Sequence, residues 1–390
     1  MLPLKAEFGW SVSVVSLAVS INLVLYGLTA PFAAALMDRF GIRAVTSTAL
    51  VLVATGSGLT IFITTRWQLL LLWGLLIGLG TGSMAMVFAA TVANRWFVRR
   101  RGLVMGILTA AGATGQLIFL PVMARLAVHS GWREASLVVS LAALAVVPLV
   151  LVFMRNHPAD RGVTPYGSLP GTPIARPVSA SGPGPAVVAV RALRVAARTR
   201  TFWALVVGFA ICGATTNGLI GVHFIPSAHD HDMPETTAAG LLAVVGVFDV
   251  VGTIASGALT DRINPRVLLV AYYGFRGVGL VLLPALLSAT VRPSIVVFVV
   301  IYGLDWVATV PPTVALCREA FGESGTIVFG WVFAAHQLGA AAASVAAGAV
   351  RDATGQYTIA WFAAAGLCAV AALVSGRVGR SAAAVRPSAA

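Results

Sequence analysis

Four ionisable residues lie in the middle of long apolar stretches of the sequence: Asp249, Arg276, Asp305 and His336. A charge at the centre of a bilayer costs at least about 2.5–3.5 kcal/mol, so such residues are candidates for function. A carboxylate in an apolar setting can exchange a proton near neutral pH, histidine titrates in that range unaided, and arginine can hold a carboxylate through two parallel hydrogen bonds. The four residues therefore predict proton coupling and the binding of an organic anion.

The same residues fit a second interpretation, a static charge network that locks the second half of the chain. Arg276 is the strongest candidate for a structural role, because an ion pair with Asp249 or Asp305 would offset the cost of burying it. The residue types leave both interpretations open. In either case the side chains are expected to face the interior of a helical bundle and to pair with one another.

Uncharged polar residues occur at similar depths. As a set they predict a polar cavity between two halves of the protein, although each alone could instead form a hydrogen bond between helices. The set comprises Asn22, Tyr26, Gln116, Asn217, Thr253, Thr309 and Gln337. Pro311 and Pro312 come shortly after Thr309 and predict a kink in that helix.

Catalytic and metal-binding patterns are absent from the sequence. No H-E-x-x-H and no Walker A sequence occurs, and Cys212, Cys317 and Cys368 have no zinc spacing. Residues 229–232 read His-Asp-His-Asp, but adjacent side chains on a loop diverge, so we expect a solvated loop and no metal site. We therefore expect neither an enzyme nor a cofactor.

The sequence that holds these residues is too apolar for a soluble protein. Hydrophobic residues make up 58% and charged residues 10%, against about 25% charged residues in soluble proteins. A transmembrane helix needs roughly 20 apolar residues, so the sequence predicts an all-α membrane protein. The predicted spans are residues 12–35, 44–64, 69–94, 103–126, 135–154, 202–225, 237–259, 267–288, 294–316, 326–349 and 357–375.

The positive charges predict an orientation. The formal net charge is +13, and alternate connections carry 19 positive residues against 6 in the opposite set. Because Lys and Arg concentrate in cytoplasmic loops, the N-terminus is predicted to be external, and the linker and C-terminus cytoplasmic. This distribution indicates a multi-pass membrane protein and not a nucleic-acid-binding surface.

A short motif occurs twice, 223 residues apart. Residues 36–43 read L-M-D-R-F-G-I-R and residues 259–266 read L-T-D-R-I-N-P-R. A repeat at half the length of a hydrophobic chain predicts two related bundles. We expect the protein to alternate between two conformations, each open to one side of the membrane. The charged residues of both copies are expected to make contacts that hold one conformation and break in the other. They are Asp38, Arg39, Arg43, Asp261, Arg262 and Arg266.

The predicted organisation is two bundles joined by a linker. The expected boundaries are 1–154 for the N-terminal bundle, 155–200 for the cytoplasmic linker, 201–380 for a C-terminal six-helix bundle and 381–390 for a cytoplasmic tail. Arg191, Arg194 and Arg198 fall on one helical face, which predicts a short basic helix against anionic lipid headgroups. A plain solvated linker is the alternative.

The two loop motifs resemble those of the major facilitator superfamily. Further strings resemble its bacterial monocarboxylate and oxalate transporter branch: E-F-G-W-S at 7–11, R-W-F-V-R-R-R-G at 95–102, S-G-W-R at 130–133 and F-D-V-V-G-T at 248–253. Four positions depart from the pattern. Ala34 and Asn264 replace glycines of the motifs, Thr253 stands where animal monocarboxylate carriers have an arginine, and Leu2 stands where they have a lysine.

The resemblance implies twelve transmembrane helices in two pseudo-symmetric bundles, of which this chain would contain eleven, without the first. It also implies a monomeric secondary transporter that works by alternating access, with a proton and a small organic anion such as a carboxylate as its partners. Efflux of an amphipathic, drug-like compound is an alternative. A transporter-like sensor that binds without transporting is another.

Overall fold

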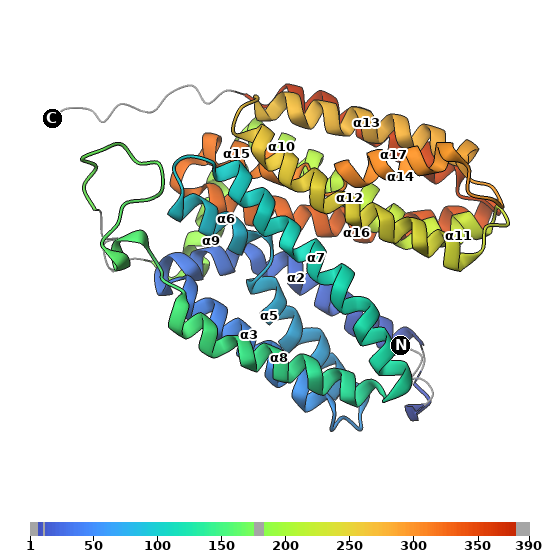
Figure 1. The fold of residues 1–390 in the computed structure, drawn as a ribbon, viewed down its shortest axis with the longest axis horizontal. Helices are drawn as coiled ribbons and strands as arrows, with labels where there is room; N and C mark the ends of the chain where they lie inside the picture. Colours follow the sequence, from blue (N-terminus) through green and yellow to red (C-terminus); the bar gives the residue numbers. More distant parts are fainter. Residues whose placement is uncertain (1–6, 11, 175–182, 380–390) are drawn as a thin grey trace.

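The computed structural model describes residues 7–10, 12–174 and 183–379, which form helices arranged in two bundles (Figure 1). Helices prevail because an apolar segment away from water must satisfy its own backbone N–H and C=O groups. The predicted all-α membrane fold is confirmed. The predicted tail 381–390 and Leu2 lie outside the described residues.

The N-terminal bundle is built from the helices between residues 12 and 153. They are α2 (Val12–Phe40), α3 (Ile42–Thr60), α4 (Arg66–Leu69), η1 (Leu70–Leu76), α5 (Ile77–Ser83), α6 (Met86–Trp96), α7 (Arg101–His129) and α8 (Trp132–Phe153). Gly41 joins α2 to α3 at a φ of +88°, which glycine adopts without strain, and an added Cβ there would collide with the Asn156 side chain.

The C-terminal bundle follows a linker that contains η2 (Pro158–Arg161) and α9 (Pro185–Ala196). Its elements are α10 (Arg200–Gly213), η3 (Ala214–Ile220), α11 (Gly221–His229), α12 (Glu235–Thr260), α13 (Pro265–Leu286), α14 (Pro293–Asp305), α15 (Val310–Phe321), η4 (Gly322–Ser324), α16 (Gly325–Thr354) and α17 (Thr358–Gly376).

The described residues contain ten apolar helical segments long enough to cross a membrane. One of them, Pro293–Thr354, has 62 residues and suffices for two crossings, because one crossing takes about 20. All eleven predicted spans therefore correspond to helical segments. Hydropathy did not predict that η1 and η3 are π-helical, or that α14 and α15 are separated by a break. Such irregular stretches are frequent at functional sites.

The two bundles pack closely at the end where α2, α6 and α12 finish, which we call the arginine-rich end. There α2 packs on α16, and α7 packs on α12. A Cβ added to Gly330 would come within 2.6 Å of Pro31, and one added to Gly106 within 2.6 Å of the Thr253 carbonyl oxygen. Toward the opposite end the bundles diverge (Figure 1), and Val345 of α16 is 75% exposed. The structure is therefore closed at the arginine-rich end.

The bundles differ in one packing position. In the C-terminal bundle, α10 packs against the last two long helices, α16 and α17. The corresponding last two helices of the N-terminal bundle are α7 and α8. No described residue fills the position on α7 and α8 that corresponds to α10. Only 11% of the apolar window of α8 is buried, so these two helices present a large apolar surface.

Candidate functional site

The centre of the C-terminal bundle contains a break between α14 and α15. Helix α14 ends at Asp305, residues 306–309 form turns, and α15 begins at Val310. Pro311 and Pro312 have no N–H group, so they begin α15 and cannot continue α14. The predicted kink is thus a full break. Because it lies in an apolar interior, its free backbone groups need polar side chains as partners.

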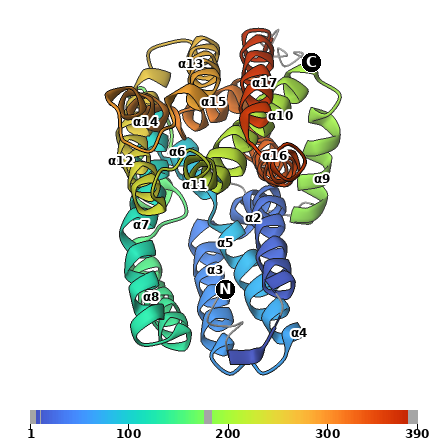
Figure 2. The same cartoon turned by 90° about the vertical axis from the view of Figure 1, so that its right-hand side faces the viewer.

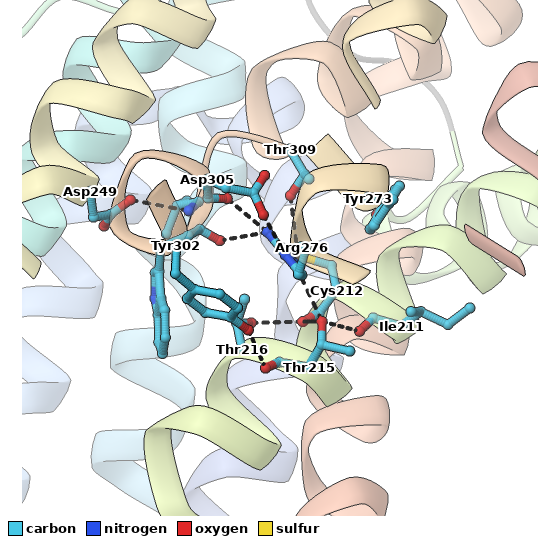
Figure 3. A network of polar contacts seen from close by, with 12 residues as sticks. Ile211, Cys212, Thr215, Thr216, Asp249, Tyr273, Arg276, Tyr302, Asp305 and Thr309 are labelled. Atoms are coloured by element: carbon cyan, nitrogen blue, oxygen red, sulfur yellow. Dashed lines mark hydrogen bonds and ion pairs between the residues drawn. The ribbon is translucent and has the colours of Figure 1, made fainter. Parts of the chain in front are cut away.

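Arg276 of α13 is the main partner of this break, and its side chain is fully buried. Its Nε–H group donates to Asp305 Oδ2 at 2.6 Å, and its Nη2 group donates to the backbone carbonyls of Asp305 at 2.7 Å and Trp306 at 3.3 Å (Figure 3). One guanidinium therefore neutralises a buried carboxylate and also satisfies two carbonyls at the break.

The remaining donors of Arg276 connect the break to α10 and η3. Its Nη1 group donates to Cys212 Sγ at 3.2 Å and to Thr215 Oγ1 at 3.3 Å. The Cys212 Sγ atom also lies 3.1 Å from Thr309 Oγ1. All five guanidinium N–H groups thus have acceptors. In this structure Arg276 has no donor left for a substrate carboxylate.

Asp249 of α12 lies on the other side of the break. Its Oδ1 atom accepts hydrogen bonds from the Thr253 hydroxyl at 2.8 Å and from the Val307 backbone N–H at 3.1 Å. Both donors are neutral. Asp249 can therefore gain or lose a proton without leaving a guanidinium unpaired, whereas protonation of Asp305 would remove the counter-charge of Arg276.

His336 of α16 lies among aromatic rings beside this network. Its ring centroid is 4.9 Å from that of Phe209 and 5.9 Å from that of Phe333, and its Nδ1 atom is 3.4 Å from the Gln337 amide oxygen. Gly213, the last residue of α10, packs closely against His336. The structure therefore places Asp249, Arg276 and Asp305 at the helix break, and His336 beside the end of α10 in the same bundle.

Two of the predicted polar residues lie where α2 meets α16. The Tyr26 ring packs edge-on against Phe333 across the two bundles, with centroids 5.5 Å apart. Gln337 packs against Gly27 in the same layer. These contacts lie in the layer where α2 of the N-terminal bundle packs on α16 of the C-terminal bundle.

The other predicted polar residues lie at separate places in the two bundles. Asn22, one turn from Tyr26, donates to the Trp73 carbonyl at 3.0 Å, and Asn217 is exposed on η3. Thr253 and Thr309 belong to the buried network. The side chain of Gln116 lies outside the described part of the chain.

Asp261 links the two bundles at the arginine-rich end. It directly follows α12, and its two carboxylate oxygens accept hydrogen bonds from the backbone N–H groups of Gly102 at 2.8 Å and Leu103 at 3.0 Å. These N–H groups belong to the first turn of α7, where a helix has unsatisfied donors and favours negative charge.

The equivalent residue Asp38 is arranged differently. It forms an ion pair with Arg95 of α6 at 2.8 Å, inside its own bundle. Arg266 likewise pairs with Glu319 of α15 at 2.7 Å inside the C-terminal bundle. The two copies of the motif are therefore not equivalent, because the bond between bundles comes from the second copy.

The other motif arginines lie near the linker or in solvent. The Arg43 backbone N–H donates to Asn156 Oδ1 at 2.9 Å, and Arg39 Nη1 donates to the Pro183 carbonyl at 3.3 Å. Arg262 is exposed.

Sequence reasoning missed several members of the buried network, among them Cys212, Thr215 and Ser256. The Ser256 hydroxyl donates to the Ala308 carbonyl at the break, at 2.5 Å. The position of Ser256 beside Asp249 and Thr253 could have been predicted, because residues 249, 253 and 256 lie on one face of a helix. No comparable spacing identifies Cys212, which comes from a different helix.

Two cavities adjoin these elements. One, of about 340 Å³, opens between α13 and α14 and reaches Arg276 and Asp305, with walls that include the exposed residues Phe275, Val278 and Val297. The other, of about 700 Å³, lies between α2, α3 and α5. The first approaches the ion pair from the outer surface of the bundle and not from the space between the bundles.

The histidine-rich tract at the opposite end has protein partners. Asp230 pairs with Arg351 at 2.7 Å, and this hydrogen-bonded guanidinium holds the pKa of the Asp230 carboxyl below its usual value. His231 Nδ1 lies 2.8 Å from the Ser227 carbonyl. Among the described residues, no group of three His, Cys, Asp or Glu side chains is placed to hold a metal ion.

Comparison with known proteins identifies the fold and its relatives. Residues 1–344 match the Major Facilitator Superfamily. The uncharacterized MFS-type transporter YcxA of Bacillus subtilis is 26% identical over 92% of this chain and 84% of its own length. Monocarboxylate transporter 13 of Rattus norvegicus is 30% identical over 90% of this chain and 77% of its own length.

Solved structures agree on the architecture. The fucose:proton symporter FucP of E. coli superposes with a TM-score of 0.70 at 17% identity, over 97% of this chain and 94% of its own. The proton:xylose symporter XylE also superposes with a TM-score of 0.70, at 15% identity, over 97% and 91%. At these identities the likeness concerns the fold alone.

Proposed function

Because the chain belongs to the major facilitator superfamily, we propose that it is a secondary active transporter that moves a small organic anion, such as a monocarboxylate, together with a proton. It is a multi-pass membrane protein. We place it in a bacterial inner membrane as a monomer, with the arginine-rich end in the cytoplasm.

The observation that carries this proposal is the closure of the two bundles at one end only. Asp261 and the Gly106–Thr253 contact hold α7 against α12 there, while the opposite ends diverge. A transporter that alternates between access states needs such a contact to be formed in one state and broken in the other. With the arginine-rich end in the cytoplasm, the structure is the outward-facing state.

We assign different roles to the ionisable residues. Arg276 and Asp305 neutralise each other, which leaves Asp249 and His336 as the candidates for the coupled proton. A protonated His336 would place a positive charge beside Gln337 and Phe333, in the layer where α2 meets α16. A carboxylate could be held there. The monocarboxylate transporters among the relatives of this chain support an anion of this class.

Counterflow in proteoliposomes tests the proposal. Vesicles loaded with an unlabelled monocarboxylate should accumulate the labelled compound, and an inward proton gradient should drive net uptake. Protein-free vesicles are the control, because small acids cross bilayers in their neutral form. Binding of the compound without any exchange would show a sensor and refute transport.

A second candidate function is favoured by the cavity between α13 and α14. Its walls are lipid-facing, so an amphipathic compound could enter it from the bilayer and reach Asp305. Val278→Trp and Val297→Trp would fill this cavity. Transport of an amphipathic substrate would then fall, whereas carboxylate transport through the space between the bundles would persist.

A further inference from the structure

Helix α9 lies across the closed junction of the two bundles. Its small residues Ala189, Ala192 and Ala196 are buried against the core, and it contacts both α2 and α16. Trp331 of α16 donates its indole N–H to the Ala189 carbonyl at 3.0 Å. On the side of α2, Arg39 donates to the Pro183 carbonyl just before α9 begins. The linker helix is therefore bonded to both halves at the arginine-rich end.

The outer face of α9 has the opposite character. Arg191 and Arg194 of α9 and Arg198, two residues beyond its end, are all exposed at helical spacing, and the neighbouring Val187 and Val195 are each 58% exposed. The sequence contains no acidic residue from position 161 to position 229 that could neutralise these arginines locally. Exposed arginines flanked by exposed valines are typical of a helix that lies in a membrane interface.

The position of α9 fits this environment. Figure 2 looks along the long axis of the molecule and shows α9 from the side, at the edge of the molecule next to α10, while α16 is seen end-on. Helix α9 thus runs crosswise to α16, and Figure 1 shows it at the arginine-rich end near α6 and α15. Its buried face points to the bundle, and its arginines point away from it.

We propose that α9 binds anionic lipid headgroups of the cytoplasmic leaflet through Arg191, Arg194 and Arg198, and that this binding stabilises the outward-facing state. Opening of the arginine-rich end must separate α2 from α16, and α9 cannot then keep its contacts with both. A lipid that binds docked α9 more tightly than released α9 shifts the equilibrium toward closure. Each basic residue near an anionic surface strengthens binding about fivefold.

The inference rests on one part of the proposed function, that the protein alternates between access states. The experiment measures conformation and lipid binding without any substrate, so it remains informative even if the protein transports a compound other than a monocarboxylate. Spin labels at Ala44→Cys and Ser324→Cys, both exposed at the arginine-rich end, report the separation of the bundles. The native cysteines are buried and escape labelling. Distances are compared in nanodiscs of phosphatidylcholine and of phosphatidylcholine with phosphatidylglycerol.

Phosphatidylglycerol should increase the short-distance population of the wild type. The variant R191Q/R194Q/R198Q should lose this response and retain phosphatidylglycerol roughly a hundredfold less in native mass spectrometry. R191K/R194K/R198K should keep both properties, and the matched control R155Q/R161Q, outside α9, should behave as the wild type. Trp331→Phe should keep lipid retention but weaken the conformational response.

Several results would overturn the inference. One is a wild-type distance distribution that does not change with lipid composition. Another is an equal response of the triple glutamine variant. A third is the same shift produced by glycerol 3-phosphate in pure phosphatidylcholine nanodiscs, which would assign the site to a soluble phosphate.

Discussion

Arg276 binds Asp305 twice, through the side-chain carboxylate at 2.6 Å and through the backbone carbonyl at 2.7 Å. The first bond neutralises the charge, and the second satisfies a carbonyl where α14 ends. The pair therefore maintains the helix break in an apolar interior, which favours the structural interpretation for these two residues.

Asp305→Asn should consequently impair folding. Loss of the carboxylate leaves the Arg276 guanidinium buried without a counter-charge, which typically costs about 3–5 kcal/mol. We expect a lower folded yield and a lower unfolding temperature in detergent, measured by fluorescence-detected size exclusion. Asp249→Asn is the matched control, since Asp249 bonds only neutral donors. Equal stability of the two variants would show that the ion pair is dispensable.

The sequence predicted the helical segments well because hydrophobicity and length determine a membrane crossing. It also singled out Asp249, Arg276, Asp305 and His336, whose common depth in the membrane stays a prediction. It could not decide between Asp249 and Asp305 as the partner of Arg276, because both aspartates fit the required depth and the choice depends on helix rotation and on the break at residues 306–309. Hydropathy does not register π-helical turns, so η3 was not predicted either.

The repeat was informative about architecture and less so about contacts. Both motif copies predicted gating aspartates, yet Asp38 pairs with Arg95 in its own bundle, while Asp261 bonds the other bundle. The difference comes from residues outside the motif. Helix α6 supplies an arginine beside Asp38, and the start of α7 supplies free N–H groups beside Asp261.

Asp261→Asn should destabilise the outward-facing state. The amide keeps one acceptor but loses the negative charge at the N-terminus of α7, and a lost helix cap costs about 1 kcal/mol. We expect a several-fold increase in the labelling rate of a cysteine introduced at the inner face of the arginine-rich end. Asp38→Asn should change this rate less, because its ion pair lies within one bundle. A larger increase in the labelling rate for Asp38→Asn than for Asp261→Asn would contradict the conclusion that Asp261 holds the two bundles together.

Gly106→Val should prevent complete closure of the arginine-rich end. Even a single Cβ at this position would come within 2.6 Å of the Thr253 carbonyl oxygen, and that backbone has no room to move within α12. Every transport cycle must pass through the state in which the arginine-rich end is closed. Raising the free energy of that state by about 1.4 kcal/mol or more should lower transport at least tenfold. Gly112→Val is the control on the same helix, since a Cβ there meets nothing within 4 Å. Comparable loss in both variants would indicate a general effect on α7.

Asp249→Asn should abolish uptake driven by a pH gradient while leaving substrate exchange intact, because exchange requires no net proton movement. His336→Gln should instead reduce both if His336 supplies the positive charge for the anion. Asp230→Asn is the control: its ion pair with Arg351 keeps the pKa of Asp230 below the usual value, so this carboxylate stays charged between pH 5 and pH 8 and contributes no pH dependence there. Uptake is measured in proteoliposomes with and without the gradient. If Asp249→Asn and His336→Gln both keep full gradient-driven uptake, the coupled ion does not bind at either residue, and the buried charges serve only the helix break.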